Sequence, residues 1–511
     1  MTQTELILAE IPADKFDSFT KEELIVLLKG EQSIRRQLQK KLDKITALKE
    51  LLEQQRIELQ GRYCTIKNQL FGKSSEKAPR HSDRPAKHTT SKENKKRVLL
   101  PSERYPDAPL IEQHITVDEL PICKCCHSQM QDSGMSEDSE FLTVIPEQYF
   151  VIKQLRHIYR CGKCHGDLQA APLPPRIKDS SSYSDEMMID VALSKYCDLI
   201  PIERYSAIAA RGGLRNLPQQ SLIETTHYLA DYVKPAYDKL KTEITAATVL
   251  HADETPHRML EGDKKCHWFL WGFSTNKTSY FECHDTRSGD VACALLAKAN
   301  CRSLVSDVYS GYSKAVRLAN DARRQNKQEL IEHVFCNAHP RRYFRQSGQD
   351  TFPVEAEFFV TQYKYIYSLE DQAKEKPPDE LLGLRAQMRP YFEDMKMRCL
   401  QDLPRYSEKS SLAKAMRYFL KNYDGLTRFI TNPELPIDNN PQERLLRNPV
   451  IGRKTWYGTH SKLGAKTAAI LFSLVESCKL NKINPREYFK KLVATLHQGK
   501  SAFTPAQFAA L

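Results

Sequence analysis

The sequence has no apolar run that approaches the roughly 20 residues needed to cross a bilayer. Its first residues, MTQTELILAEIPADKF, do not contain the basic stretch followed by an apolar stretch that marks a secretory signal. The 14 cysteines are scattered without a disulfide framework, apart from two Cys-x-x-Cys pairs. These absences exclude an integral membrane protein and a secreted disulfide scaffold, and we expect the chain in a reducing cytoplasm with no membrane partner.

The chain is long, apolar enough to fold, and basic. Its length of 511 residues suggests about three to four domains, and an apolar fraction of 41% allows a sizeable core. The 76 Lys and Arg residues exceed the 64 Asp and Glu residues, which gives a net charge of +12. This excess favours a polyanionic partner such as a nucleic acid. A merely basic soluble protein remains the alternative, because a charged fraction of 27% is ordinary.

The N-terminal region, residues 1–72, has the pattern of a long helix. From about residue 20 to residue 70 it is rich in Leu, Glu, Lys and Gln and contains no Pro. Apolar residues recur there at every seventh position, namely Leu38, Ile45, Leu52, Leu59 and Ile66. This repeat with charged flanks predicts a coiled coil, and therefore a homo-oligomer that is at least a dimer. A long amphipathic helix docked on its own protein is the alternative.

The next two regions are predicted to be a basic linker and a zinc ribbon. Residues 73–104 are mostly polar and basic, as in a solvated linker that also contacts DNA phosphates without sequence choice. Residues 105–175 contain two Cys-x-x-Cys pairs separated by strand-like sequence, and such paired thiolates suit one structural Zn²⁺. The predicted ligands are Cys123, Cys126, Cys161 and Cys164, with Cys125 and His127 as nearby competitors. The partner of such a ribbon is DNA or another protein.

Residues 176–247 are predicted to form helices. A dense apolar face over 187–193 is followed by a break at Gly212 and Gly213, and the helical pattern resumes at Leu217. Helix, glycine-containing turn and helix is the arrangement of a DNA-reading helix-turn-helix. A plain helical hairpin is the alternative.

Strands and helices follow one another from residue 248. The predicted strands cover 248–252, 267–273, 279–284, 303–306 and 332–336, and the predicted helices cover 290–299 and 312–320. Three strands, a helix, a strand, a helix and a strand is the order of a ribonuclease-H-like domain. In that fold one acidic residue lies on the first strand and a second follows the fourth strand, which are the places of Asp253 and Asp307.

Three acidic residues, Asp253, Asp307 and Glu443, are the candidate catalytic groups. Carboxylates at two strand ends and on a later helix can converge, and they can then hold two divalent metal ions against a phosphodiester. Glu254 is expected to point to the opposite face from Asp253, because strand side chains alternate. His251 shares the face of Asp253, where it either packs or supports the acid.

Glu443 lies at the start of a predicted helix that Asp438 or Asn439 can cap. Arg447 follows one turn later on the same face of this helix. Arg444 and Arg447 could hold a phosphate near the metal ions. An ion pair between Glu443 and Arg447 is the alternative.

Six segments form a recognisable set. Three contain the acids, namely HADETP (251–256), SDVYSGY (306–312) and DNNPQERLLR (438–447). The other three are FGKSSEK (71–77), CNAHPRRYF (336–344) and IGRKTW (451–456). Together they resemble the insertion sequence 66 family of bacterial DDE transposases. The resemblance covers roughly residues 20–495. Pro340 departs from the family pattern, in which a small or apolar residue is commoner.

The resemblance implies a transposase in which Asp253, Asp307 and Glu443 form the catalytic triad, with two Mg²⁺ or Mn²⁺ ions in each active site. Its partners would be double-stranded DNA, both the terminal inverted repeats and the target, and accessory proteins of the same element. Its place of action would be the bacterial cytoplasm, in association with the nucleoid. The residues expected to contact DNA are Arg444, Arg447, Arg453, Lys454, His339, Arg341 and Arg342.

The fold class expected from these observations is multidomain α+β. The N-terminal coiled coil, the zinc ribbon and the helical DNA-binding region precede a ribonuclease-H-like α/β catalytic core. The resemblance implies that a helical insertion over residues 346–432 divides this core into 248–345 and 433–511, the second part ending in C-terminal helices.

Two other functions fit the same sequence. A catalytically idle relative would bind DNA as a regulator, although intact acids at all three positions argue against it. A metal-dependent nuclease on the same fold would cut DNA without strand transfer. A joined DNA product distinguishes a transposase from such a nuclease.

Overall fold

The computed structural model describes residues 20–71, 168–260 and 267–510 without a break. Between residues 100 and 160 it describes 100–106, 109–112, 119, 121–122, 124–125, 127–130, 139–143 and 148–160. The predicted zinc ligands Cys123, Cys126, Cys161 and Cys164 lie outside the described residues, as does the predicted linker up to residue 99. Among the helices of the described ranges, none is long and apolar enough to span a membrane. The chain divides into two compact units, and the larger one includes Asn216–Leu511.

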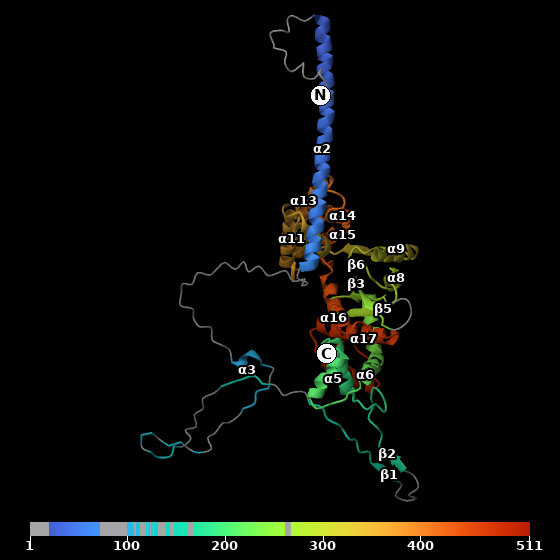
Figure 1. The fold of residues 1–511 in the computed structure, drawn as a ribbon. Helices are drawn as coiled ribbons and strands as arrows, with labels where there is room; N and C mark the ends of the chain where they lie inside the picture. The colour runs from blue at the N-terminus through green and yellow to red at the C-terminus, as the bar shows by residue number, and fades with distance from the viewer. Residues whose placement is uncertain are drawn as a thin grey trace. The chain divides into compact units, whose positions relative to one another are not determined.

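One long helix, α2 (Lys21–Phe71), forms the N-terminal region (Figure 1). It begins with a capping box. The backbone N–H of Thr20 donates to the Glu23 carboxylate at 2.9 Å, and the Thr20 hydroxyl accepts from the N–H of Glu23 at 3.4 Å. Leu38 and Ile45 of the predicted heptad repeat are 59% and 64% exposed. Their apolar surface is therefore open to a partner, and self-association stays a prediction.

Short strands and a set of helices precede the catalytic region. The helices are α3 (Pro101–Arg104), α4 (Asp185–Tyr196), α5 (Ile202–Arg211), α6 (Gln219–Tyr232) and α7 (Lys234–Ala246). Strands β1 (Ile158–Arg160) and β2 (Leu168–Ala170) pair antiparallel. The turn between α5 and α6 contains Gly213 with a φ of +95°, a conformation that favours glycine. Helix, glycine turn and helix is the predicted order, and DNA contact by these helices stays a prediction.

A five-stranded mixed sheet contains the strands predicted from residue 248 onward. Its strands are β3 (Val249–Arg258), β4 (His267–Ser274), β5 (Ser279–His284), β6 (Ser303–Ser306) and β7 (Glu332–Phe335). Their order in the sheet is β5-β4-β3-β6-β7; β4 is antiparallel to both β3 and β5, and β6 is parallel to both β3 and β7. Helices α8 (Asp290–Leu296) and α9 (Ser310–Gln325) occur between strands where helices were predicted.

One predicted strand boundary is wrong. β3 continues to Arg258 instead of ending at residue 252, so Asp253 lies inside the strand. The extension pairs with β4, in a register that places Asp253 opposite Gly272 and Arg258 opposite His267. Apolar patterning could not show this extension, because its residues are polar or charged apart from one proline.

Helices occupy the interval between β7 and the last part of the chain. They are α10 (Ala338–Asp350), α11 (Pro353–Ala373), α12 (Pro378–Ala386), α13 (Arg389–Asp402), α14 (Ser411–Lys421) and α15 (Tyr423–Thr427), with 3-10 turns at Leu403–Arg405 and Arg428–Thr431. Their aromatic residues form a hydrophobic cluster in which the rings of Phe344 and Phe359 stack at 4.2 Å. Val305 of β6 and Val334 of β7 belong to the same cluster. These helices therefore pack on the sheet face that carries the odd-numbered residues of β6, which is the side of Asp307.

The last helices belong to the same core as the sheet. They are α16 (Asn440–Trp456), α17 (Lys462–Leu480), α18 (Pro485–His497) and α19 (Pro505–Phe508). Helix α17 lies beside the edge strand β5 (Figure 1). The hydroxyls of Ser473 and Ser477 accept hydrogen bonds from the backbone N–H groups of Phe281 and Ser279, at 2.8 Å and 2.9 Å. This helix thus satisfies backbone groups that an edge strand would otherwise leave open.

Candidate active site

The sheet register places Asp253 and Asp307 side by side. Strands β3 and β6 run parallel, and His251 lies opposite Val305 in their ladder. Asp253 and Asp307 each follow two positions later, on the same face as those paired residues. Because neighbouring strands are about 4.8 Å apart, the two carboxyl groups meet where β6 ends and β3 continues, paired there with β4.

Glu443 joins the two aspartates from the first turn of α16. Burial raises the pKa of Asp253 well above its ordinary value, and the negative charges of Glu254, Asp307 and Glu443 raise it further. A hydrogen bond from the backbone N–H of Glu254 to the Asp253 carboxylate, at 2.9 Å, opposes the shift. The three predicted acids therefore lie within electrostatic reach of one another, and their mutual repulsion favours a bound cation.

The turn after β6 holds Asp307 in place. Its carboxylate accepts a hydrogen bond from the backbone N–H of Tyr309 at 3.0 Å. The guanidinium of Arg287 lies over the Tyr309 ring, 4.1 Å from its centroid, and the Tyr309 hydroxyl donates to the Arg287 carbonyl at 2.8 Å. Asp307 is thus oriented by the backbone of Tyr309, whose own side chain is held by Arg287.

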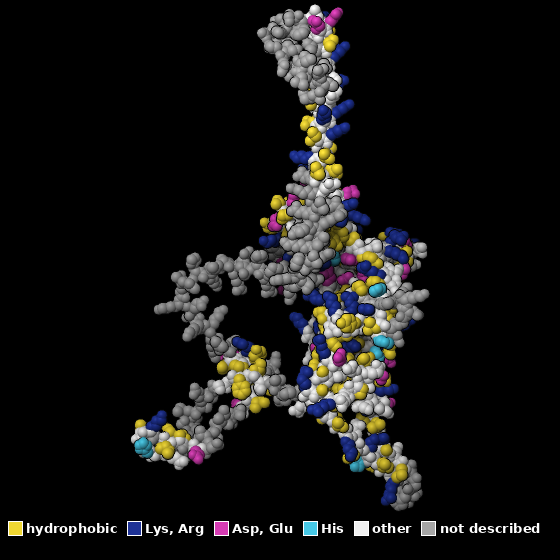
Figure 2. Space-filling view, viewed as in Figure 1, with side chains coloured by type: hydrophobic (Ala, Val, Ile, Leu, Met, Phe, Trp, Pro, Cys, Tyr) yellow, Lys and Arg dark blue, Asp and Glu magenta, His cyan; other side chains and the backbone are white. Residues whose placement is uncertain are grey.

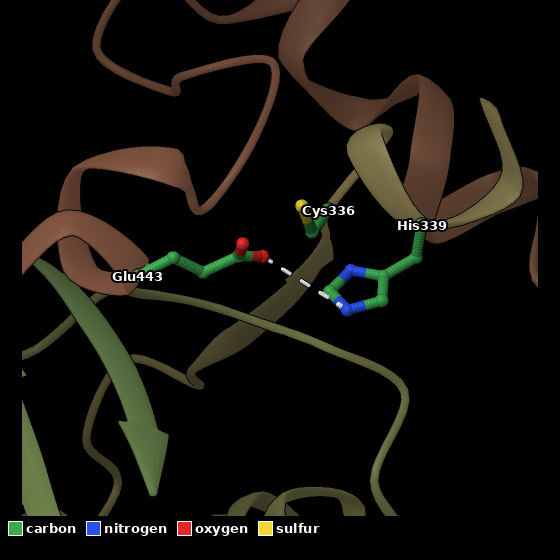
Figure 3. A group of neighbouring side chains, drawn as sticks. All are labelled: Cys336, His339 and Glu443. Carbon is green, nitrogen blue, oxygen red and sulfur yellow. Dashed lines mark ion pairs between the residues drawn. The ribbon is translucent and has the colours of Figure 1, made fainter. Parts of the chain in front are cut away.

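Glu443 has basic neighbours from another segment of the chain. The Arg342 guanidinium lies 3.4 Å from one carboxylate oxygen of Glu443, and the Nε2 atom of His339 lies 3.9 Å from the other. Figure 3 shows His339 pointing toward Glu443, with Cys336 close to both. The ion pair with Arg447 that the sequence left open is replaced by the pair with Arg342, since Arg447 lies exposed on α16.

Cys336, His339 and Glu443 lie close enough to suggest a second metal site, since their ligand atoms are within 4.8 Å of one another. The thiol is already in use, because the Sγ atom of Cys336 accepts a hydrogen bond from the backbone N–H of Asn439 at 3.2 Å. Burial raises the pKa of this thiol to about 12, which favours the protonated form over the thiolate that binds metals. Cys336 therefore anchors the start of α16, and Glu443 belongs with the carboxylates.

Asn439 connects α16 to β3 beside Asp253. Its amide nitrogen donates to the carbonyl of Ala252 at 2.8 Å, and its amide oxygen lies 2.8 Å from the Nδ1 atom of His251. Asn439 occupies the N-cap position, but its side chain does not cap the helix. The Asp438 carboxylate accepts from the backbone N–H of Asn440 at 3.1 Å instead. The sequence suggested Asp438 and Asn439 only as caps, so the link between helix and strand was missed.

Gly272 is a further residue that the sequence reasoning missed. It lies opposite Asp253 in the β3–β4 ladder. A Cβ atom there would lie 2.2 Å from the side-chain nitrogen of Gln442 and 2.9 Å from the ring of Phe281. A side chain at this position would require Gln442 of α16 and the ring of Phe281 to shift. The signal was a lone glycine inside an aromatic strand, which often marks a close approach.

Glu254 points to the opposite face of the sheet from Asp253, as predicted. Its side chain is 2% exposed and forms an ion pair with Arg287 at 2.6 Å. The hydroxyl of Tyr312, on α9, donates to the same carboxylate at 2.5 Å. This fourth acid is thus fully paired, which separates it from the three that converge.

The basic residues predicted to contact DNA lie in different places. His339 and Arg342 lie beside Glu443, whereas Arg341 lies over the ring of Tyr367, 4.6 Å from its centroid. Residues of α16 form the other group. Arg444, Arg447 and Lys454 are exposed, and Arg453 is half-buried near Thr255, with 3.4 Å between its guanidinium and the hydroxyl.

Comparison with known proteins agrees with this geometry. Residues 180–467 match the profile of the family described as "Transposase IS66 family". The chain is also similar to two proteins of Sinorhizobium fredii (strain NBRC 101917 / NGR234). One, "Uncharacterized protein y4hP", is 23% identical over 416 residues, 77% of this chain and 73% of the relative. The other, "Uncharacterized protein y4jD", is 26% identical over 394 residues, 74% of this chain and 75% of the relative.

The profile match confirms the resemblance inferred from the six sequence segments, and it includes all three predicted acids. The two relatives extend the similarity over most of the chain but name no activity of their own. Because the match spans more than half of the 511 residues, the chain belongs to the IS66 family of transposases.

Proposed function

We propose that this transposase binds the terminal inverted repeats of an insertion sequence and catalyses metal-dependent DNA cleavage and strand transfer. The observation that carries the proposal is the convergence of Asp253, Asp307 and Glu443 from two strands and a helix. Burial, and then the charges of Glu254, Asp307 and Glu443, raise the pKa of Asp253, so the three predicted acids act on one another electrostatically. Such an arrangement is unfavourable by itself and favours a divalent cation.

The donor atoms suit Mg²⁺ or Mn²⁺. All three predicted ligands are carboxylates, which are the ligands that these hard cations prefer. One carboxylate oxygen of Glu443 is buried and, within the described part of the chain, has no hydrogen-bond partner. Asp253, Asp307 and Glu443 would hold two such ions. When bound, the ions would supply activation of a water or 3′-hydroxyl and stabilisation of the leaving oxygen.

The neighbouring side chains orient the acids and bind phosphate. Asn439 holds the start of α16 against β3, and this contact positions Glu443 relative to Asp253. Arg342 lies beside Glu443 and is half exposed, so its guanidinium can bind a non-bridging oxygen of the scissile phosphate. His339 lies on the same side of the acid and can donate a second hydrogen bond to that strand.

The remaining regions would find and pair the DNA ends. The strand order β5-β4-β3-β6-β7 supports a ribonuclease-H-like core, with α10 to α15 as its helical insertion. The exposed apolar residues of α2 support self-association, which would bring two DNA ends together. Helices α5 and α6 would contact the repeat, together with the predicted zinc ribbon. Accessory proteins of the element would complete the assembly, and the place of action would be the bacterial nucleoid.

The decisive test is Glu443→Gln, measured by cleavage of labelled element-end DNA with Mg²⁺ or Mn²⁺. This change removes one ligand charge and keeps the side-chain shape. We expect cleavage to fall by about 100-fold or more, the size of effect seen when one charge-stabilising group is removed. Thermal unfolding should stay close to that of the wild type, because Glu443 makes only long contacts with its neighbours.

The matched control is Glu434→Gln, an exposed glutamate in the loop before α16. It should leave cleavage unchanged. Undiminished cleavage by Glu443→Gln would sink the assignment of the acids. A joined product from a labelled 3′ end would distinguish strand transfer from simple nuclease action, and wild-type protein that binds but never cuts would identify a regulator.

A further inference from the structure

A pocket of about 360 Å³ lies where the far end of β3 meets the last turn of α16. The C-terminal end of β3 contributes Pro256, His257 and Arg258, and β4 contributes His267 at its first residue. The other wall comes from the end of α16 and the residue that follows it. Two of the three elements that line the pocket also carry the predicted acids, β3 with Asp253 and α16 with Glu443.

The rim of the pocket is cationic. Arg258, Arg453 and Lys454 all line it, and within the described ranges none of the three pairs with a carboxylate. Arg453 is held in place by hydrogen bonds to the Pro256 carbonyl and to the Thr255 hydroxyl. Figure 2 shows Lys and Arg side chains gathered over the region where Figure 1 labels α16. Unpaired cations around a hollow favour an anionic ligand such as a phosphate.

Tyr457 adds an aromatic surface to the same rim. It follows α16 directly and is 69% exposed. Its φ of 65° and ψ of 0° place it in the left-handed region, where Gly or Asn is the usual residue after a helix. A large exposed aromatic side chain in this conformation gains nothing from burial. Residues held in such sparsely populated backbone conformations cluster at active sites and ligand-binding segments.

The backbone around Tyr457 is fixed to β3. Gly458 has a φ of +123°, and a Cβ atom there would lie 2.0 Å from the carbonyl oxygen of Arg258. The N–H of Thr459 donates to that carbonyl at 3.0 Å, and the Thr459 carbonyl accepts from Leu260 at 2.8 Å. These backbone contacts therefore fix the position of residue 457 relative to β3, the strand that also carries Asp253.

The pocket lies within a few nucleotides of the proposed scissile phosphate. Pro256 and Arg258 follow Asp253 by three and five residues in β3. At roughly 3.3 Å per residue this is about 10 to 17 Å. One strand of B-form DNA carries a phosphate about every 3.4 Å along the axis, so this separation corresponds to about three to five nucleotides.

We propose that this pocket binds one unpaired nucleotide of the DNA strand that passes the three acids. Its base stacks on Tyr457, and its phosphate lies against Arg258, Arg453 and Lys454. Stacking on an aromatic ring accepts any base, so the site reads the unpaired state and not the sequence. The proposal rests on the proposed function in one respect, namely that the strand in the pocket is the one to be cut or joined.

The test uses the full-length protein without added Mg²⁺ or Mn²⁺ and without a chelator, so that the predicted structural Zn²⁺ is kept. Two fluorescent probes are compared, a ten-residue oligothymidine and a blunt duplex. Tyr457→Asn should weaken oligothymidine binding by about fivefold or more, since one base–aromatic contact is lost. Duplex binding should change by less than twofold. Because asparagine tolerates the left-handed region, the unfolding midpoint should stay equal or rise, so lost binding cannot come from misfolding. Tyr457→Phe keeps the ring and should bind like the wild type.

Two matched variants complete the design. Lys454→Ala should lower the slope of log affinity against log salt by about 0.7, the value for one phosphate contact with a single strand. Lys500→Ala, an exposed lysine near the C-terminus, should leave that slope unchanged. Photo-cross-linking of 5-iodouracil in the oligothymidine should identify the peptide that contains Tyr457.

The proposal is overturned if Tyr457→Asn leaves the oligothymidine affinity within twofold, or weakens duplex binding equally. It is also overturned if the cross-links avoid Tyr457. These outcomes are separate from failure of the proposed function, which is read from cleavage in Mg²⁺. If the wild type never cuts DNA but Tyr457→Asn weakens oligothymidine binding, the pocket proposal stands and the proposed enzymatic function falls. If the wild type cuts DNA but Tyr457→Asn leaves oligothymidine binding unchanged, the proposed function stands and the pocket proposal falls.

Discussion

The two faces of the sheet differ in how their charged side chains are paired. On one face, Glu254 is buried but paired with Arg287 and Tyr312. On the other face, below α16, the neighbouring residue Asp253 meets two more acids instead of a base. Further along that face, Arg453 lies beside buried His257 and lowers its pKa. On the first face the acid contacts its base. The second face has an acidic end, where Arg342 and His339 lie beside Glu443 alone among the three acids, and a basic end, where Arg453 and Lys454 form no ion pair with a described carboxylate.

This difference teaches where a ligand belongs. Buried charges in folded proteins are normally paired, because unpaired burial costs several kcal/mol. The excess of acids at one end supports the proposed divalent cation there, and the exposed Arg258 and Lys454 support the proposed phosphate at the basic end. A DNA strand with its metal ions supplies both. The comparison can be tested by removing the cationic partner of Glu254 on one face and by adding a cation to the three acids on the other.

The largest effect is expected on the paired face. Arg287→Ala leaves the Glu254 carboxylate buried without its cation. It should lower the free energy of unfolding by about 3 kcal/mol, the lower end for a broken buried pair, because Arg287 itself is 48% exposed. Urea unfolding measures this. The control is Arg302→Ala, which removes an exposed pair with Glu329 and should cost no more than about 1 kcal/mol. Equal effects of the two changes would contradict the view that this face depends on its pairing.

The free energy of unfolding should depend on pH through a histidine on the α16 face. Burial, and then the charge of Arg453, lowers the pKa of His257 from 6.5 to about 4. Between these values the unfolded chain binds more protons than the folded chain, so stability falls as the pH decreases through this window. The loss should reach about 3 kcal/mol below pH 4. His257→Gln should flatten this part of the pH profile, and its own structural cost is read separately at pH 8. An unchanged profile would contradict a buried neutral histidine.

Adding the missing cation should stabilise the acidic end. Mg²⁺ or Mn²⁺ at about 100 times its dissociation constant should raise the free energy of unfolding by about 2.7 kcal/mol. Asp253→Asn should abolish this gain, and without metal it should be as stable as the wild type or slightly more stable, because a repelled acid is removed. Differential scanning fluorimetry with and without metal measures both effects. A metal-dependent gain that survives Asp253→Asn would place the cation elsewhere.

The smallest effect is expected at the joint between β3 and α16. Asn439→Ala leaves the Ala252 carbonyl and the His251 ring without this partner, which should cost about 1–3 kcal/mol. The cleavage rate should fall even under conditions where the variant is fully folded, because Glu443 loses its fixed distance from Asp253. Asn481→Ala, on a peripheral bond to the Lys277 carbonyl, is the matched control. A loss of cleavage no greater than the control's would contradict a positioning role.

Much of the catalytic region could be predicted from local patterns. The strands of the sheet and the helices between them appear in the predicted order, since apolar runs and turn residues act over a few positions. The extension of β3 beyond Asp253 was not predictable in this way, because its residues have no apolar pattern and are held in the strand by pairing with β4. The shape of the basic pocket was equally hidden, since Arg258 and Tyr457 are far apart in the sequence.

The roles of the site residues were also predictable only where they depend on local sequence. The alternation of strand side chains correctly separated Asp253 from Glu254. The partner of Glu443 was open, and the fold supplied Arg342 from a helix about 100 residues earlier, a contact between positions 101 apart. Asn439 was taken for a cap because capping is the local use of asparagine before a helix. Its actual bonds cross to β3, and no local rule reaches that far.

The sequence by itself determined which chemistry was available: three acids in family-like segments, a basic balance and a leucine-rich helix. Those are properties of residue type and short spacing, and they persist in the unfolded chain. Only the tertiary structure decided which charges were compensated, because pairing depends on distances of a few Å between segments far apart in the chain. The register of β3 against β6 and the bonds of Asn439 brought the acids together, and the packing of α16 over Gly272 placed Glu443 among them, with Arg342 as its partner.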